Sequence, residues 1–475
     1  MRRITAVAIF EVLMVCNANS QGILNKVKVY FNHPVDNSFS TTGINAKYVP
    51  HGILDTIAAY INRAKYTVDI AQYDYTAYNT DTIADIATAV NNAYKRGVKV
   101  RWLHDSSSTN VGLSLLSAGI PRFGSPPVGG IYNIMHNKFV IIDVWDSNRA
   151  IVSDGSEDWS PEMNDFDYNN IVFVQSKVLA RAFTNEFNIM WGDTTHGAGP
   201  NKTNSKFGTT KPNSGTHKFS IAGSEVELYF SPSDSCNNHV IKTINAAKTD
   251  LYCGMYDFTQ TAYSTPFVNQ GKAGIYTGCV LDQYSAGNTA YTALSATSNF
   301  AEYTGSYIYH NKFITADPSN ACGNPMVLTG SMNWTAAGYN QNDENIIIIH
   351  NDTIANLYLQ SFAKDLEVIG SKTLTKQKVN CTVGINGIEN NPSQIDVYPN
   401  PYKGSVTISY NLAEDANVTI NIYNIMGQKV STLVNGCSLE AGSHIYEFSG
   451  ASAGVYILQI NENGNIYTRK LVQAE

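Results

Sequence analysis

Two short stretches of this 475-residue chain carry the same pattern of ionisable side chains. In each stretch a lysine follows a histidine by two residues, and an aspartate follows the lysine by five. The first copy is His136, Lys138 and Asp143, and the second is His310, Lys312 and Asp317. Side chains two residues apart on an extended strand point to the same face, so each copy predicts that the imidazole and the ammonium project together.

These residue types suit chemistry at a phosphate group. A histidine can transfer protons near neutral pH and can also act as a nucleophile, and a lysine is a compact positive charge. Two histidines could therefore serve as nucleophile and acid at a phosphodiester, while the two lysines stabilise the non-bridging oxygens. The sequence has no carboxylate cluster with the spacing of a zinc or magnesium site, so we expect no metal and no other cofactor.

A glycine and a serine follow each copy of the pattern. The two stretches are Gly155-Ser156-Glu157-Asp158 and Gly330-Ser331-Met332-Asn333. We expect phosphate to be bound by Lys138, Lys312 and Asn333, together with Ser156 and Ser331, although the two serines could instead only form turns. Asp158 stands where the other copy has Asn333, and an anion facing a phosphodiester is repulsive. Either its side chain is turned away, or the first half binds less of the phosphate. Asp143 and Asp317 end their strands, and we expect structural roles for both.

Together these stretches resemble the phospholipase D superfamily, whose site is defined by H-x-K-x4-D followed by G-S-x-N. The resemblance covers roughly residues 24–370. It implies two α/β/α sandwich halves in a pseudo-two-fold arrangement, with one site at the seam. It also implies a phosphohistidine intermediate on His136, with His310 as general acid and then general base. The superfamily includes lipases, nucleases and lipid synthases, so the substrate stays open.

The same resemblance implies a carboxylate beyond each G-S-x-N stretch that orients the histidine of the opposite half. Glu344 fits this catalytic role for His136. In the first half the aligned residue is Asn169, although Asp167 close by in the chain could take its place. A carboxylate partner fixes the imidazole tautomer and stabilises the imidazolium. We therefore expect His136 to be the better supported nucleophile.

The wider sequence predicts an α/β fold built twice. Strand-like and helix-like segments alternate from Lys26, with helices expected over 52–65, 80–96 and 177–191. A similar order restarts near Glu225, but less sequence precedes the second motif. We therefore expect the second copy to have lost part of its middle helix and strand.

Between the two copies, residues 192–224 form a connector. It carries Lys202, Lys206, Lys211 and Lys218 with no acidic residue among them. We interpret it as a solvated linker, with a phosphate-contacting loop as the alternative.

Beyond residue 378 the composition changes to short alternating segments, at 406–410, 418–423, 443–448 and 455–460. This pattern predicts a small all-β sandwich. Its V-Y-P-N-P opening, Gly454-Val455-Tyr456 and a terminal Thr468–Val472 resemble the C-terminal sorting domain of type IX secretion cargo. The resemblance implies that the type IX machinery is a partner. A carbohydrate-binding or adhesion sandwich is the alternative.

The chain begins with features of a signal peptide, namely Arg2-Arg3, an apolar run over 6–15 and a small-x-small site ending at Ser20. No transmembrane segment is expected after it, so we predict a secreted or cell-surface protein. Six cysteines remain: Cys236, Cys253, Cys279, Cys322, Cys381 and Cys437. They allow one or two disulfides, or buried free thiols at Cys253 and Cys279.

The predicted organisation is a signal peptide (1–20), a first half (21–191), the connector (192–224), a second half (225–378), a linker (379–394) and the β-sandwich (395–475). Because both motifs lie in one chain, we expect a monomer. The leading hypothesis is a secreted, metal-independent phosphodiesterase that cleaves phospholipid headgroups. A non-specific endonuclease on the same scaffold is the alternative, although a net charge of -7 weakens it. A non-catalytic binding protein is a third possibility, which two intact motifs argue against.

Overall fold

The computed structural model describes residues 22–78, 85–129, 132–297, 299–321, 323–377, 394–412, 415–449, 452–463 and 465–474. The predicted signal peptide and almost all of the predicted linker lie outside these residues. The chain divides into two compact units, residues 1–381 and 382–475. Each unit is described by itself.

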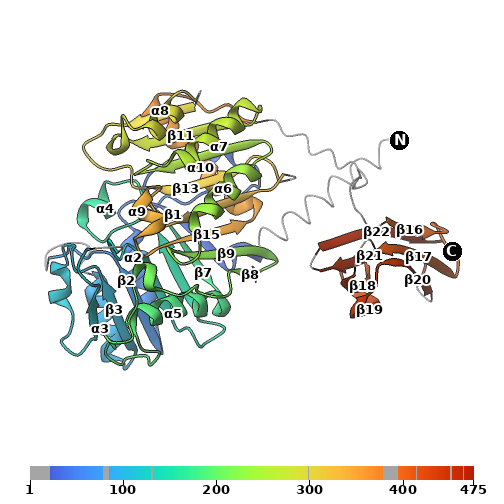
Figure 1. Ribbon diagram of the computed structural model, residues 1–475, viewed down its shortest axis with the longest axis horizontal. Helices are drawn as coiled ribbons and strands as arrows, with labels where there is room; N and C mark the ends of the chain where they lie inside the picture. The colour runs from blue at the N-terminus through green and yellow to red at the C-terminus, as the bar shows by residue number, and fades with distance from the viewer. Residues whose placement is uncertain are drawn as a thin grey trace. The chain divides into compact units, whose positions relative to one another are not determined.

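The first half of the N-terminal unit is built on a seven-stranded mixed sheet (Figure 1). Its strands are β1 (Val27–Phe31), β2 (Thr67–Gln72), β3 (Lys99–His104), β4 (Arg122–Gly124), β5 (Lys138–Ile142), β6 (Ile151–Gly155) and β7 (Asn170–Gln175). They lie in the order β1-β7-β6-β5-β2-β3-β4. Helices α2 (Ile53–Asn62) and α3 (Asp85–Lys95) pack on one face, and α5 (Lys177–Trp191) packs on the other. A short helix, α4 (Pro161–Asp165), precedes β7.

The second half repeats this arrangement strand for strand. It contains β9 (Ser224–Ser231), β10 (Asp250–Met255), β11 (Tyr276–Asp282), β12 (Asn299–Tyr303), β13 (Lys312–Ala316), β14 (Met326–Gly330) and β15 (Glu344–His350). The sheet order is β12-β11-β10-β13-β14-β15-β9-β8. Read in reverse it matches the first sheet, with the strand β8 (Lys218–Ile221) added at the edge. Its helices are α6 (Cys236–Ala246), α7 (Thr261–Lys272), α8 (Thr289–Ser295), α9 (Ala336–Asn340) and α10 (Asp352–Gly370). The predicted duplication of an α/β unit is confirmed.

The expected loss of the middle helix and strand from the second half is wrong. Helix α7 and strand β11 are both present between β10 and the second motif. The helix was hard to recognise because it carries Pro266 in its interior and buries only Tyr263, Ser264 and Phe267. Such a helix lacks the continuous apolar stripe on which a periodicity argument depends.

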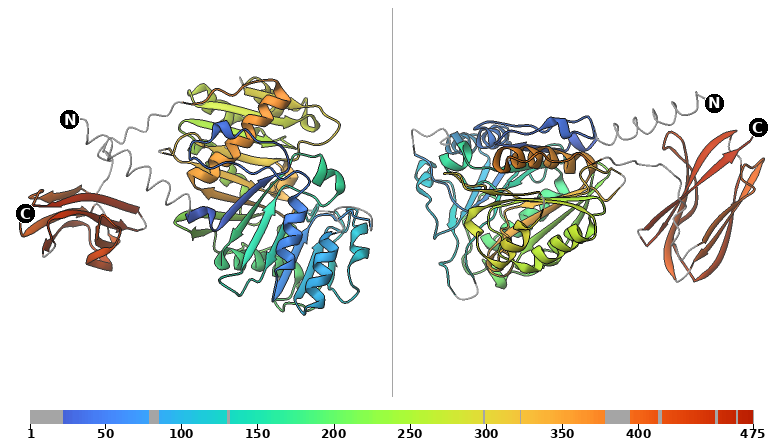
Figure 2. Two further views of the ribbon diagram at one scale, coloured as in Figure 1. Left: turned by 180° about the vertical axis from the view of Figure 1, so that it is seen from behind. Right: turned by 90° about the horizontal axis from the view of Figure 1, so that it is seen from above.

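Alternate residues of each motif strand pack in different cores. In β5, Val140 and Ile142 pack under α2 and α3, whereas Phe139 and Ile141 face a second core. That second core also contains Phe313 of β13, so the two halves share it. Each fully buried side chain of this size contributes roughly 1.5–3 kcal/mol to stability. The shared core therefore holds the two motif strands together across the seam. Figure 2 shows the two halves of this unit from two further sides.

The prediction that the connector is a solvated linker is wrong for its later part, whereas Lys202 and Lys206 are exposed. Its end forms β8 (Lys218–Ile221), which pairs with β9, and Lys218 makes an ion pair with Glu225. The side chain of Lys211 is fully buried between two carboxylates. The absence of acidic residues among these lysines was misleading, because Lys211 and Lys218 find acidic partners outside the segment.

The C-terminal unit is the predicted all-β sandwich. One sheet contains β16 (Gln394–Tyr398), β17 (Ser405–Leu412) and β20 (Gly442–Ser449). The other contains β19 (Lys429–Leu439), β18 (Ala416–Asn424), β21 (Gly454–Glu462) and β22 (Asn465–Gln473). Apolar residues alternate toward one core, and Val406, Ile408, Val418, Ile420 and Leu458 are fully buried there.

Four of the six cysteines lie in described residues, and all four are free. Cys253 and Cys279 are register partners on the parallel strands β10 and β11, and their sulfur atoms lie 3.0 Å apart. Both are buried, which agrees with the interpretation as core thiols. Cys322 and Cys381 lie outside the described residues.

Candidate active site

The two motif histidines sit just before their strands rather than within them. Strands β5 and β13 begin at Lys138 and Lys312, two residues beyond His136 and His310. In each copy the lysine Nζ donates a hydrogen bond to the carbonyl oxygen of its histidine, at 3.0 Å in both cases. All four side chains are at most 6% exposed. The extended strand expected to include each histidine therefore starts only at the lysine, but each lysine still lies against its histidine.

A carboxylate from the second half contacts the histidine of the first. The Nδ1 atom of His136 lies 2.9 and 2.8 Å from the two carboxylate oxygens of Glu344, the first residue of β15. The His136 backbone N–H donates to the carbonyl of Asp343 at 2.8 Å, which holds the two chain segments side by side. A proton on Nδ1, shared with this carboxylate, leaves the lone pair of Nε2 for chemistry.

His310 has an amide in place of a carboxylate. Its Nδ1 lies 3.1 Å from Oδ1 of Asn169. The Nδ2 group of Asn169 donates to the carbonyl of Met163 at 3.0 Å, so the amide oxygen faces the ring. The hydroxyl of Ser156 donates to the same oxygen at 2.7 Å. His310 must therefore carry its proton on Nδ1 when neutral.

Asp158 points into the site. Its Oδ1 lies 3.0 Å from Nζ of Lys138, and its Oδ2 lies 3.7 Å from Nε2 of His310. The side chain is only 8% exposed. Of the two expectations for this residue, the outward orientation is wrong. The equivalent Asn333 is partly buried, and its Oδ1 has no hydrogen-bond partner within the described residues.

Burial and neighbouring charges set the protonation of these groups. Burial, followed by Lys138, lowers the pKa of His136 well below its usual value, and burial and Lys312 do the same for His310. Burial and Lys138 also lower the pKa of Lys312 to about 7. Burial raises the pKa of Glu344 to about 8, against the opposing effect of Lys138. The site thus holds a neutral His136 near neutral pH.

The two motif aspartates bind the backbone of neighbouring loops, and the serines of the two G-S pairs bind residues of the site. Asp143 accepts hydrogen bonds from the backbone of Tyr66, and Asp317 accepts them from Thr249, both at 2.7 Å. These contacts secure the loops that enter β2 and β10, at the ends of the motif strands away from the histidines. The hydroxyl of Ser331 accepts a hydrogen bond from the backbone N–H of Asn345 at 3.0 Å, and that of Ser156 accepts one from Asn170 at 3.2 Å.

Two tyrosines that the functional interpretation did not include also line the site. Tyr73 packs on His136 with ring centroids 4.9 Å apart, and its ring lies 5.1 Å from Nζ of Lys138. Tyr256 stands in the same relation to His310 and Lys312, at 5.1 and 5.4 Å. The signal was present in the sequence, because Tyr73-Asp74 and Tyr256-Asp257 recur at the same place in each half.

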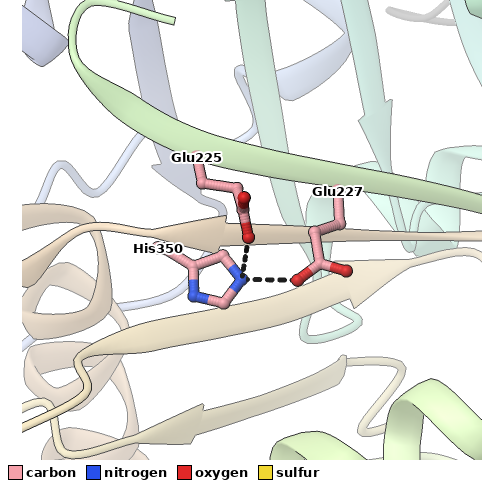
Figure 3. Close-up of side chains that lie close together, drawn as sticks. All are labelled: Glu225, Glu227 and His350. Carbon is pink, nitrogen blue, oxygen red and sulfur yellow. Dashed lines mark hydrogen bonds and ion pairs between the residues drawn. The ribbon is translucent and has the colours of Figure 1, made fainter. Parts of the chain in front are cut away.

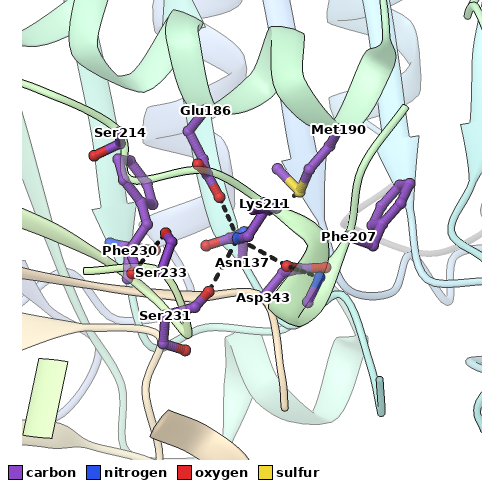
Figure 4. A network of polar contacts seen from close by, with 12 residues as sticks. Asn137, Glu186, Met190, Phe207, Lys211, Ser214, Phe230, Ser231, Ser233 and Asp343 are labelled. Atoms are coloured by element: carbon purple, nitrogen blue, oxygen red, sulfur yellow. Dashed lines mark hydrogen bonds and ion pairs between the residues drawn. The ribbon is translucent and has the colours of Figure 1, made fainter. Parts of the chain in front are cut away.

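A buried ion-pair network surrounds Lys211 (Figure 4). The ammonium of Lys211, from the connector, contacts Glu186 of α5 and lies 2.7 Å from Oδ1 of Asp343. It also donates to the carbonyl of Ser231 at 2.9 Å. Burial disfavours the charged lysine, but Asp343 and Glu186 outweigh this and raise the pKa of Lys211. The connector therefore fixes the residue that precedes Glu344.

A second group of ionisable side chains lies outside the site. Glu225 and Glu227 of β9 point toward His350 at the end of β15 (Figure 3). His350 Nε2 lies 2.8 Å from Glu227, and Lys218 lies 2.9 Å from Glu225. The sequence did not predict this cluster, because its side chains come from different strands. Lys218 and His350 already supply partners for both carboxylates.

Comparison with known proteins agrees with this geometry. The family described as "Cardiolipin synthase, PLD-like domain" matches residues 57–191 and 240–366, which together make up more than half of the chain. The secretion system C-terminal sorting domain matches residues 396–474.

Among curated proteins, phospholipase D of Rickettsia prowazekii is 26% identical over 145 residues, which is 30% of this chain and 68% of the relative. The mitochondrial cardiolipin hydrolase of Drosophila melanogaster is 28% identical over 151 residues, covering 28% of this chain and 57% of the relative. The chain thus spans from about half to about two thirds of the length of its curated relatives.

Two solved structures illustrate the range of similar folds. Nuc of Salmonella typhimurium, a phospholipase D family member, is 28% identical and covers 29% of this chain and 91% of its own, with a TM-score of 0.26. Phosphatidylserine synthase of Haemophilus influenzae is 13% identical and covers 73% of this chain and 87% of its own, with a TM-score of 0.46.

The sorting domain directs export by the type IX route, so the protein is secreted or held at the cell surface. No helix within the described residues has both the length and the hydropathy to cross a bilayer. The chain belongs to the phospholipase D-like family of phosphodiesterases, with a family domain in each half and a secretion sorting domain at its C-terminus.

Proposed function

We propose that this protein hydrolyses the headgroup phosphodiester of phospholipids through a phosphohistidine intermediate on His136, without a metal ion. The observation that carries the proposal is the contact between His136 Nδ1 and Glu344 across the two halves. It directs the lone pair of Nε2 toward the seam, where both lysines and the second histidine lie.

In the first step, Nε2 of His136 attacks phosphorus and the bond to the headgroup oxygen breaks. His310 donates a proton to the leaving oxygen, and Lys138 and Lys312 stabilise the charge on the non-bridging oxygens. Asn333 adds a hydrogen bond from its amide. Glu344 stabilises the positive charge that develops on the His136 ring.

In the second step, a water molecule attacks the phosphohistidine from the side that the headgroup has left. His310, now neutral, takes a proton from this water, and the bond from phosphorus to His136 breaks. The products are phosphatidic acid and the free headgroup alcohol. An alcohol in place of water would give a transphosphatidylation product by the same steps.

Surface features near the site favour a lipid substrate. Phe166 and Tyr307 come from different halves, stack at 4.5 Å between centroids and are 50% and 43% exposed. Each precedes a site residue by three positions, Asn169 and His310 respectively. Tyr284, which is 67% exposed, stacks on Tyr256. Exposed aromatic rings of this kind suit the boundary between water and acyl chains.

Two of the four connector lysines give little support to the nuclease alternative. Lys211 is buried in an ion-pair network, and Lys218 is paired with Glu225. Binding to a nucleic-acid backbone depends on cations that are free to contact phosphates. The relatives named phospholipase D and cardiolipin hydrolase also favour a lipid substrate.

The test is an assay of the purified full chain, with EDTA present, on phosphatidylcholine and cardiolipin vesicles and on single-stranded and duplex DNA. Headgroup release without DNA cleavage would support the proposal. DNA cleavage without headgroup release would replace it with the nuclease alternative. Loss of lipid hydrolysis on adding EDTA, with recovery on adding a metal, would overturn the metal-independent mechanism.

A further inference from the structure

The two halves differ by an exchange of an acid and an amide at matched positions. The second half has an amide at Asn333, after its G-S pair, and a carboxylate at Glu344, at the start of β15. The first half has a carboxylate at Asp158 and an amide at Asn169. Each half therefore keeps one carboxylate and one amide, but at opposite places.

The exchange changes which nitrogen of each histidine meets a carboxylate. Glu344 contacts His136 at Nδ1, at 2.8 Å. Asn169 occupies the corresponding position at His310, while Asp158 approaches the other nitrogen, Nε2, at 3.7 Å. Because Nδ1 of His310 already carries a proton toward the Asn169 oxygen, a second proton on Nε2 would face an anion.

We propose that Asp158 takes over for His310 the part that a carboxylate at position 169 would have had. Its negative charge near Nε2 favours the imidazolium form of the ring, the form in which His310 acts as general acid. Asp158 is thus a positioning residue, fixed in turn by Lys138 at 3.0 Å. This inference rests on the proposed function, since it assigns a partner to the general acid of that mechanism.

The surroundings of His310 make such a partner necessary. Lys312, Lys138 and His136 all face the ring and disfavour its positive charge, and burial acts in the same direction. The ring of Tyr256 and the amide of Asn169 are uncharged, and the Ser156 backbone accepts only a single hydrogen bond from the ring. Within the described residues, Asp158 is the carboxylate that forms an ion pair with His310.

The deciding experiment compares four full-length proteins: wild type, Asp158→Asn, Asn169→Glu and the double variant. The exposed Glu367→Gln serves as a control with the same loss of charge as Asp158→Asn. Two quantities are measured on each, the pH profile of kcat/KM and the titration of His310 by NMR of histidine-labelled protein. The His310 signal is identified by its loss in His310→Asn, and thermal unfolding checks that each variant is folded.

We expect Asp158→Asn to lower kcat about tenfold or more and to move the His310 titration to lower pH by about one unit, since a nearby opposite charge shifts a pKa by one to three units. Adding Asn169→Glu to the Asp158→Asn variant should restore most of the lost kcat and most of the shift in the His310 titration. If Asn169→Glu disturbs folding at the Met163 carbonyl, Asn169→Asp takes its place.

Two results would overturn the inference. One is a rise in kcat/KM for Asp158→Asn with an unchanged His310 titration, because Asp158 would then only block the phosphate. The other is a double variant whose kcat and His310 titration are the same as those of Asp158→Asn alone. If the wild type hydrolyses no phosphodiester at all, the proposed function fails, but the His310 titration still tests the role of Asp158.

Discussion

The two halves of the N-terminal unit share one fold but have different electrostatic settings around their histidines. Both sheets follow the same strand order, and both lysines donate to a histidine carbonyl at 3.0 Å. His136, however, has a carboxylate on Nδ1, whereas His310 has an amide there and a carboxylate near Nε2. A duplicated scaffold can therefore place two identical side chains in different chemical roles.

This difference matters because the two steps of the proposed reaction need two different histidines. A nucleophile needs its lone pair on Nε2 and a partner that accepts the proton of Nδ1. A general acid needs a proton on Nε2 and a way to keep it in a buried, positively charged site. The first description fits His136 and the second fits His310, so each prediction below tests this asymmetry.

The largest effect is expected from His136→Asn, which removes the proposed nucleophile. Turnover should fall by about a thousandfold or more, within the range for loss of an acid–base or nucleophilic group. His310→Asn should also be inactive on lipid, but should still form the covalent intermediate on an activated aryl phosphodiester, whose phenolate leaves without a proton. Rapid-quench trapping of labelled protein separates the two. Label on His136→Asn but not on His310→Asn would reverse the roles.

The next largest effect is expected from Lys211→Met, which leaves Glu186 and Asp343 without their buried cation. Breaking a buried pair costs about 3–5 kcal/mol, so the free energy of unfolding measured in urea should fall by roughly that amount. The exposed Lys206→Met in the same connector is the matched control and should change little. Because Asp343 precedes Glu344, kcat should fall as well. A loss below about 1 kcal/mol would show that the connector does not support the site.

The sequence predicted the repeated fold and the four motif side chains because these depend on local patterns. Alternation in 406–410 and periodicity in 177–191 are properties of neighbouring residues, and β17 and α5 include these segments. The environment of Lys211 was not predictable in this way, since Glu186 and Asp343 are 25 and more than 100 residues away. The inward orientation of Asp158 was likewise open, because it depends on the packing of both halves.

A smaller effect is expected from Glu344→Gln, which keeps the shape of the His136 partner but removes its charge. Formation of the intermediate should slow by roughly a hundredfold, because a charge-assisted bond contributes about 1.5–3 kcal/mol. Asn169→Ala, which removes a neutral partner of His310, should slow the same step less. Rapid-quench rates for the two variants test this directly. Equal and small effects would contradict the cross-half pairing of Glu344 with His136.

The smallest effect is the difference in kcat/KM expected between substitutions of the two lysines. Asp158 already pairs with Lys138 at 3.0 Å, whereas no ion pair of Lys312 occurs within the described residues. Lys312→Met should therefore lower kcat/KM about tenfold more than Lys138→Met, a difference of about 1.4 kcal/mol. The pKa of Lys312, lowered by burial to about 7, adds a pH dependence with a definite sign.

Below pH 7 the Lys312 ammonium is charged and attracts the phosphate, and above pH 7 it loses its proton, so kcat/KM should fall as the pH rises through this value. This limb should disappear in Lys312→Met and move to higher pH in Lys138→Met, because Lys138 helps to lower the pKa of Lys312. A profile that keeps the limb in Lys312→Met would assign it to another group. Equal losses for both lysines would show that Asp158 does not weaken the first half as a phosphate site, and the asymmetry would then be confined to the histidines.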